Sequence, residues 1–261
     1  MPRRIGLAAL TVLELSPPEL VSTAAQAGYD SVGLRLIPVA GQPHSHRVDV
    51  AEIEARVRDT GVRVLDVEVF RLEPATDVSA FELVLAQAQR LGASEILVHG
   101  ADPDAARLAE RFGRLCEAAA KHRLHVNLEP MPWVAVSNIP KARALIDAAA
   151  KDNAALLVDA IHFFRAGDRF GDLKGARLRY VQLCDAPGER PADMAEIVRQ
   201  ARSARRFPGE GELDLEGLLR VLPADLPISV EAPVEAALPP LERARHALIA
   251  TRKVLEKCGL R

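Results

Sequence analysis

The chain has 261 residues and a formal net charge of −2, so it lacks the excess of basic residues with which proteins bind nucleic acid. Its length suits one large domain with a substantial core. Three cysteines, Cys116, Cys184 and Cys258, lie too far apart in sequence for a disulfide framework or for zinc-finger spacing.

The N-terminal segment imitates part of a secretory signal, because Arg3 and Arg4 precede the apolar run 5–13. That run is short and leads into Glu14 and two prolines without a small-residue cleavage site. We therefore expect a strand here. No run approaches the roughly 20 apolar residues of a membrane span, so we expect a cytoplasmic protein that does not associate with membranes.

Short apolar runs alternate along the chain with longer segments of helical period. This alternation is typical of repeated βα units around a parallel sheet. The expected strands span residues 5–11, 31–36, 62–70, 95–99, 126–129, 155–159, 178–184 and 228–231.

Capping residues bound the segments between the strands. Ser16, followed by two prolines and Glu19, indicates a helix start, whereas Gly28 and Gly92 indicate helix ends. Ser137 is expected to cap a later helix. The expected helices cover residues 17–28, a segment ending near 60, 78–91, 104–121, 137–150, 192–204, 215–221 and 240–257.

Eight βα units in a chain of this length predict an α/β protein with one (β/α)8 TIM barrel domain over residues 1–261. A doubly wound open sheet is the alternative. No glycine-rich phosphate loop follows the first strand, so the barrel is favoured.

In a barrel the C-terminal ends of all strands converge on one face, where residues distant in sequence meet. Polar side chains stand at most of these ends. They are Arg35, Glu68, His99, Glu129, Asp159 with His162, Gln182 with Asp185, and Glu231. The structural alternative for Asp159 is a helix cap, and for each glutamate a salt bridge or a cap.

Several carboxylates at one barrel mouth would repel each other and lose hydration, so either their pKa values rise or a cation neutralises them. Glu129, Asp159 and Glu231 offer carboxylate oxygens, and Gln182 offers an amide oxygen. This donor set favours Mn²⁺ or Mg²⁺ over a structural zinc site, with Zn²⁺ and Co²⁺ left open as catalytic ions.

The strand endings Leu-Glu129-Pro, Val-Asp159-x-x-His162, Val-Gln182-Leu-Cys-Asp185 and Val-Glu231 resemble those of the xylose isomerase-like TIM barrels in the sugar phosphate isomerase/epimerase family. The resemblance covers essentially the whole chain. It implies a divalent metal held by Glu129, Asp159, Gln182 and Glu231. Glutamine stands here where histidine is commonest in the family.

The resemblance also implies a function. Glu129 and Glu231 would exchange a proton with the carbon beside a carbonyl group, His162 would contact substrate oxygens, and the metal would stabilise the enediolate. The first expectation is an isomerase or epimerase of a small keto-sugar or related polyol ketone. The second is a dehydratase of the inosose or 3-dehydroshikimate type, which shares the first step and then expels a β-hydroxyl group.

Further residues near the strand ends are expected to bind the substrate. They are Glu68, His99, Trp133 and Arg190. We prefer Arg190 to Arg35 and Arg165 as the partner of an anionic group, because it follows the strand that carries Gln182. A surface ion pair is the alternative for Arg190.

Two other classes compete with these enzymes. A DNA-repair endonuclease on the same barrel is disfavoured by Gln182, which replaces a histidine that its metal cluster needs, and by the absence of a basic excess. A metal-free binding protein is favoured by Gln182 alone. The substrate, the native ion and the oligomeric state, including a homo-oligomer, are left open by the sequence.

Overall fold

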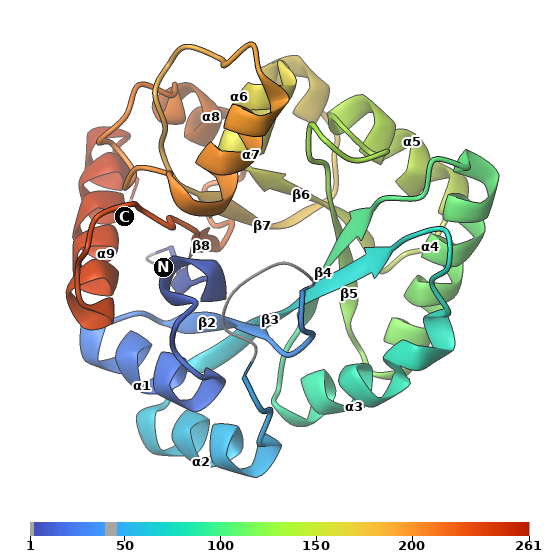
Figure 1. The fold of residues 1–261 in the computed structure, drawn as a ribbon, viewed down its shortest axis with the longest axis horizontal. Helices are drawn as coiled ribbons and strands as arrows, with labels where there is room; N and C mark the ends of the chain where they lie inside the picture. Colours follow the sequence, from blue (N-terminus) through green and yellow to red (C-terminus); the bar gives the residue numbers. More distant parts are fainter. Residues whose placement is uncertain (1–2, 40–45, 261) are drawn as a thin grey trace.

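Eight parallel strands close into a barrel in the order β1 to β8, with helices around it (Figure 1). The structure is a computed structural model that describes residues 3–39 and 46–260. The strands are β1 (Ile5–Leu7), β2 (Ser31–Arg35), β3 (Arg63–Leu72), β4 (Glu95–Gly100), β5 (His125–Glu129), β6 (Ala154–Asp159), β7 (Leu178–Leu183) and β8 (Ile228–Val230). The predicted TIM barrel is confirmed.

The helices follow the strands as the sequence pattern indicates. The α-helices are α1 (Pro17–Ala27), α2 (Val50–Thr60), α3 (Glu82–Arg90), α4 (Ala105–Lys121), α5 (Ile139–Ala149), α6 (Ala160–Ala166), α7 (Met194–Ser203), α8 (Leu215–Val221) and α9 (Pro240–Lys257). The described residues also form the short 3₁₀ helices η1 (Ala9–Val12), η2 (Val78–Phe81) and η3 (Phe170–Leu173). The expected helices omit α6 and η3, although a helix cap was the structural alternative for Asp159, and the expected first strand extends into residues that form η1.

Most helix boundaries follow from local capping. At the start of α1, Glu19 accepts hydrogen bonds from the backbone and hydroxyl of Ser16, and Gly28 ends the helix in the left-handed conformation with φ of 92°. The prediction for α5 was wrong by one residue. Asn138, not Ser137, accepts the hydrogen bond from the backbone of Lys141, because Asn138 is the last extended residue before the helix.

Two layers of apolar side chains hold the barrel together. The larger layer lies between the outer faces of the strands and the surrounding helices, as with Phe112 of α4, which is fully buried. The smaller one fills the barrel interior and consists of Leu65, Val69, Leu97, Leu157 and Tyr180. Because the interior is packed, polar groups can reach solvent only at the barrel ends.

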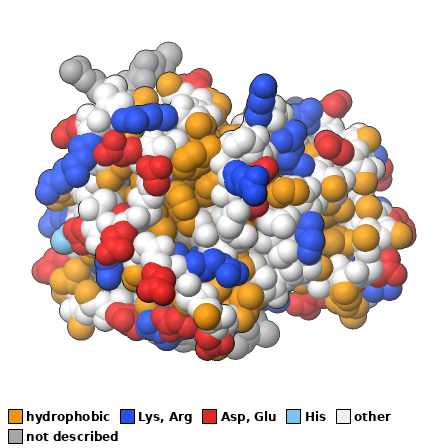
Figure 2. Space-filling view, turned by 90° about the horizontal axis from the view of Figure 1, so that it is seen from above, with side chains coloured by type: hydrophobic (Ala, Val, Ile, Leu, Met, Phe, Trp, Pro, Cys, Tyr) orange, Lys and Arg blue, Asp and Glu red, His pale blue; other side chains and the backbone are white. Residues whose placement is uncertain are grey.

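The face of the molecule drawn in Figure 2 shows no strong charge bias. On the face drawn in Figure 2, basic and acidic side chains are interspersed with apolar ones, as the small net charge leads one to expect. None of the helices in the described part of the chain combines the length and apolar character that a membrane span needs.

Candidate active site

The strand register brings the predicted polar residues to one level inside the C-terminal end of the barrel. Neighbouring strands pair Arg35 with Glu68, His99 with Glu129, and Asp159 with Gln182. Glu231 follows β8 directly, and its backbone N–H donates to the carbonyl of Leu183 at 3.1 Å. Alternation along each strand points all these side chains into the barrel, and they are almost completely buried except for Arg35 and His99.

Glu129 has one engaged and one open carboxylate oxygen. Its Oε2 lies 2.6 Å from Nε2 of His99. Its Oε1 is buried without a hydrogen-bond partner and lies 3.7 Å from Nε2 of His162. Burial, and then the nearby charge of Asp159, raise the pKa of Glu129 well above its ordinary value. A buried carboxylate in this state is suited to accept a proton.

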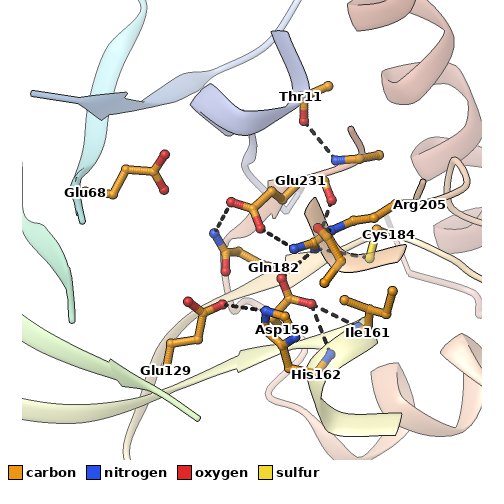
Figure 3. A network of polar contacts seen from close by, with 12 residues as sticks. Thr11, Glu68, Glu129, Asp159, Ile161, His162, Gln182, Cys184, Arg205 and Glu231 are labelled. Carbon is orange, nitrogen blue, oxygen red and sulfur yellow. Dashed lines mark hydrogen bonds and ion pairs between the residues drawn. The ribbon is translucent and has the colours of Figure 1, made fainter. Parts of the chain in front are cut away.

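Asp159 serves two purposes at once. Its Oδ1 accepts hydrogen bonds from the backbone N–H groups of Ile161 at 2.9 Å and His162 at 3.4 Å, so it caps α6 as the structural alternative predicted. Its Oδ2 forms an ion pair with Arg205 at 2.6 Å (Figure 3). Burial opposes the charge of this carboxylate, but the guanidinium of Arg205 lowers its pKa below the usual value.

Arg205 is the residue of the site that the sequence analysis missed. Its guanidinium lies between Asp159 and Glu231, 2.7 Å from Oε2 of Glu231, and is almost fully buried (Figure 3). Burial works against its charge, yet the carboxylates of Asp159 and Glu231 and the thiol of Cys184 raise its pKa well above the ordinary value. Arg205 lies in the connection between β7 and β8, away from any strand end. The nearest feature in the sequence that indicates structure is the turn expected at Pro208 and Gly209.

Gln182 and Glu231 are joined by a hydrogen bond. The Nε2 of Gln182 donates to Oε1 of Glu231 at 3.0 Å, which leaves Oε1 of Gln182 buried without a partner (Figure 3). Both oxygens of Glu231 are therefore engaged, one by Gln182 and the other by Arg205. Burial raises the pKa of Glu231 well above its usual value, although Arg205 opposes this shift.

The residues fit a divalent cation. Donor atoms of Glu129, Asp159 and His162 lie within 4.8 Å of one another. The buried Oε1 atoms of Glu129 and Gln182 have no hydrogen-bond partner, and such orphaned oxygens are costly in a protein interior unless something binds them. Of the predicted ligands, Glu129 and Asp159 belong to this group, together with His162, which was predicted only as a substrate contact. Gln182 and Glu231 lie beside it, joined to each other by a hydrogen bond and, through Arg205, to Asp159.

The two histidines of the site are neutral. Burial, followed by the charge of Arg71, lowers the pKa of His99 to about 3. Burial also lowers the pKa of His162 to about 3, despite the opposing effect of Asp159. In both rings the Nδ1 atom is buried without a partner. Trp133 packs edge-on against His162, with ring centroids 5.0 Å apart, so it forms an apolar wall of the site.

A pocket opens above these residues. Its lining includes all the predicted substrate contacts except Arg190, namely Glu68, His99, Trp133 and His162. Glu68 forms an ion pair with Arg35 at 2.9 Å. Arg190 lies outside this lining, because its Nε donates to the backbone carbonyl of Arg165 at 2.6 Å. Arg165 is also directed elsewhere, toward Gln200 and the carbonyl of Pro187.

Asp185, another polar strand end, is structural. Its carboxylate accepts hydrogen bonds from the backbone N–H groups of Ala186, Gly209 and Leu213 at 2.8 to 3.0 Å. It therefore organises the connection between β7 and α8 instead of facing the pocket.

Comparison with known proteins identifies the family and the fold. Residues 21–254 match the model of the xylose isomerase-like TIM barrel family. The 3-dehydroshikimate dehydratase of Pseudomonas aeruginosa is 30% identical over 227 residues, and that of Pseudomonas putida is 26% identical over 221 residues. Each alignment covers 77% of this chain and 33% of the relative, so the chain spans about a third of the length of these relatives.

Solved structures share the fold at lower identity. The fusion of a xylose isomerase-like TIM barrel with 4-hydroxyphenylpyruvate dioxygenase superposes with a TM-score of 0.83 at 21% identity, covering 99% of this chain and 43% of the other. The zinc-bound IolI protein gives 0.80 at 17% identity, covering 97% and 98% of the two chains. D-allulose 3-epimerase from a Methylomonas species, in complex with D-allulose, gives 0.71 at 19% identity and covers 97% of both.

Proposed function

Because the chain belongs to the xylose isomerase-like TIM barrel family, we propose that it is a metal-dependent dehydratase of a cyclic keto-polyol acid of the 3-dehydroshikimate type. From the sequence alone, an isomerase or epimerase is the first expectation and this dehydratase the second. Two observations favour the dehydratase: the relatives from Pseudomonas are named 3-dehydroshikimate dehydratase, and the two glutamates of the site differ in their contacts.

In this proposal Glu129, Asp159, Gln182 and Glu231 hold the ion, with Mn²⁺ or Mg²⁺ expected from their oxygen donors. Of these residues, Glu129 and Gln182 have an unpartnered oxygen, so binding of the ion by Asp159 and Glu231 would replace contacts that they make with Arg205 and Gln182. A bound divalent cation would polarise the substrate carbonyl and stabilise negative charge on its oxygen. Its two charges would also neutralise part of the buried acidic cluster, whose pKa values are raised at Glu129 and Glu231.

The inequality of the two glutamates is the observation that supports elimination over epimerisation. Inversion at a carbon needs one base on each face of the substrate. Glu129 has an open oxygen, but both oxygens of Glu231 are held, by Gln182 and Arg205. One free base is sufficient for removing water, because the same group can return the proton that it takes.

The proposed steps balance without an external reagent. Glu129 takes the proton from the carbon beside the carbonyl, and the electron pair of that C–H bond forms the enediolate. When the carbonyl re-forms, this pair makes a new C=C bond and the C–O bond to the β-hydroxyl breaks. Protonated Glu129 then gives its proton to the departing oxygen, which leaves as water. His162 and Trp133, beside Glu129, would position the ring of the substrate.

The test is an assay with purified protein, Mn²⁺ and 3-dehydroshikimate, followed by ultraviolet absorbance of the dihydroxybenzoate that forms by loss of water and enolisation. Inosose and D-allulose are run in parallel in heavy water. We expect dehydration of 3-dehydroshikimate, and we expect the Glu129→Gln variant to lose about 10²- to 10⁴-fold in kcat. Glu110→Gln, a change at an exposed residue, should retain full activity.

Deuterium incorporation or epimer formation with D-allulose, in the absence of any dehydration, would favour the isomerase expectation instead. Equal activity of the wild-type protein and the Glu129→Gln variant would remove Glu129 from the mechanism.

A further inference from the structure

We propose that Arg202, in the last turn of α7, binds the carboxylate of the substrate and so makes the enzyme selective for anionic keto-polyols. This inference rests on the function proposed above. It concerns a residue that is remote from the strand ends and outside the cluster of proposed metal ligands.

The position of α7 supports this role. Two helices, α7 and α8, lie between β7 and β8 in the chain, and α7 lies against α6 (Figure 1). Its last turn brings Ala201 and Arg202 to the same pocket lining as His99 and Glu129. In this fold the segments that follow the strands decide which substrate is bound. A side chain from this connection is therefore well placed to select it.

The pairing of the arginines distinguishes Arg202 from the others around the pocket. Arg35 is paired with Glu68, Arg71 with Glu73 at 3.0 Å, and Arg205 with Asp159 and Glu231. Within residues 3–39 and 46–260, Arg202 has neither a hydrogen bond nor an ion pair from its side chain, and it is exposed to solvent. A guanidinium can receive a carboxylate through two parallel hydrogen bonds.

The charges around the pocket also favour an anionic ligand. Four arginines line the pocket, namely Arg35, Arg71, Arg202 and Arg205. Three of them have carboxylate partners, so within the described residues Arg202 carries the positive charge of this lining that no carboxylate pairs with. A substrate carboxylate would offset this charge, whereas a neutral sugar would not.

The experiment measures binding of two unreactive ligands, shikimate and its methyl ester, which differ in charge and lack the ketone. Trp133 is the only tryptophan of the chain and lines the pocket, so its fluorescence reports occupancy directly. Wild-type protein with Mn²⁺ is compared with Arg202→Ala, Arg202→Lys and the control Arg206→Ala. Arg206 is exposed, lies four residues further along and lines a different cavity.

We expect Arg202→Ala to weaken shikimate binding about threefold to fivefold and to leave methyl shikimate binding unchanged, as for one solvent-accessible charged contact. Arg202→Lys should recover part of the loss, and Arg206→Ala should change neither affinity. With 3-dehydroshikimate as substrate, the Arg202→Ala change should raise KM and leave kcat within about twofold, since it removes a contact made equally in ground and transition states.

Equal weakening of both ligands by Arg202→Ala, or no weakening, would overturn the inference, as would failure of the wild-type protein to bind shikimate. The two proposals fail separately. Dehydration that does not depend on Arg202 leaves the proposed function intact and removes this inference. Shikimate binding that depends on Arg202, without dehydration of any keto acid, supports the carboxylate site and removes the proposed reaction.

Discussion

At the scale of single residues, the site is a balance between buried carboxylates and one buried cation. Asp159 and Glu231 are each within 2.7 Å of the guanidinium of Arg205. Removing one partner from a buried ionic cluster leaves the other charges uncompensated, which costs more than the net contribution of the intact cluster. Arg205 is therefore expected to contribute to folding as well as to the geometry of Asp159 and Glu231.

The Arg205→Met variant should lower the free energy of unfolding by about 3 to 5 kcal/mol, because Asp159 and Glu231 lose their common counter-charge. Urea denaturation in the presence of a chelator measures this change. Arg205→Lys keeps the charge but cannot span both carboxylates, so it should show a smaller loss. A loss below about 1 kcal/mol for Arg205→Met would mean that the cluster relaxes by protonation instead.

At the scale of elements, the connection between β7 and α8 delivers Arg205 to the site. Asp185 and Arg206 exchange two backbone hydrogen bonds, at 2.9 and 2.7 Å, and the carboxylate of Asp185 binds three further N–H groups of the connection. Gly211 packs directly against this arrangement. A Cβ at Gly211 would lie 2.2 Å from Oδ1 of Asp185 and 2.4 Å from the carbonyl oxygen of Ala186.

The Gly211→Ala variant should be destabilised by about 1 to 3 kcal/mol, because the added methyl group has to displace backbone. It should also lose activity out of proportion to its stability, since Arg205 moves with the connection. Thermal unfolding and steady-state kinetics measure the two effects. The control is Gly171→Ala in η3, where a Cβ meets no atom within 4 Å. Equal stability and equal activity of the two variants would show that the connection accommodates the added methyl group.

At the scale of the whole molecule, the proposed ion joins the ends of β5, β6, β7 and β8, which span half of the barrel. A ligand that binds only the folded state stabilises it by mass action, about 2.7 kcal/mol at a concentration of 100 times Kd. The barrel interior below the site is packed and the sheet is closed. An ion bound at the barrel mouth should therefore raise the free energy of unfolding of the whole domain.

Addition of Mn²⁺ to protein freed of metal by a chelator should therefore raise Tm with increasing ion concentration, by roughly 5 to 10 °C at about 100 times Kd. Differential scanning calorimetry measures the shift. The Glu129→Gln/Asp159→Asn double variant should show no shift, whereas Glu110→Gln should behave as the wild-type protein does. An identical shift in the double variant would place the ion elsewhere.

Local patterns in the sequence were sufficient to predict the barrel and the strand ends from which the four ligands are proposed, because strand and helix periods depend on near neighbours in the chain. α6 was not predicted because its residues follow β6 without a loop and most are buried, including Ala160 and Phe163, so no polar face marks a helical period. Asp159 was recognised as a strand end and also caps that helix.

Only the tertiary structure decided which of these groups are free to act. Arg205 and Arg202 reach the site through packing of a segment inserted between two strands, and nothing in their immediate sequence indicates this destination. The open oxygen of Glu129 and the engaged oxygens of Glu231 differ because their neighbours come from different strands. The position of a polar residue at a strand end could therefore be predicted from the sequence. Its hydrogen bonds and ion pairs could not, because they depend on contacts between residues distant in the chain.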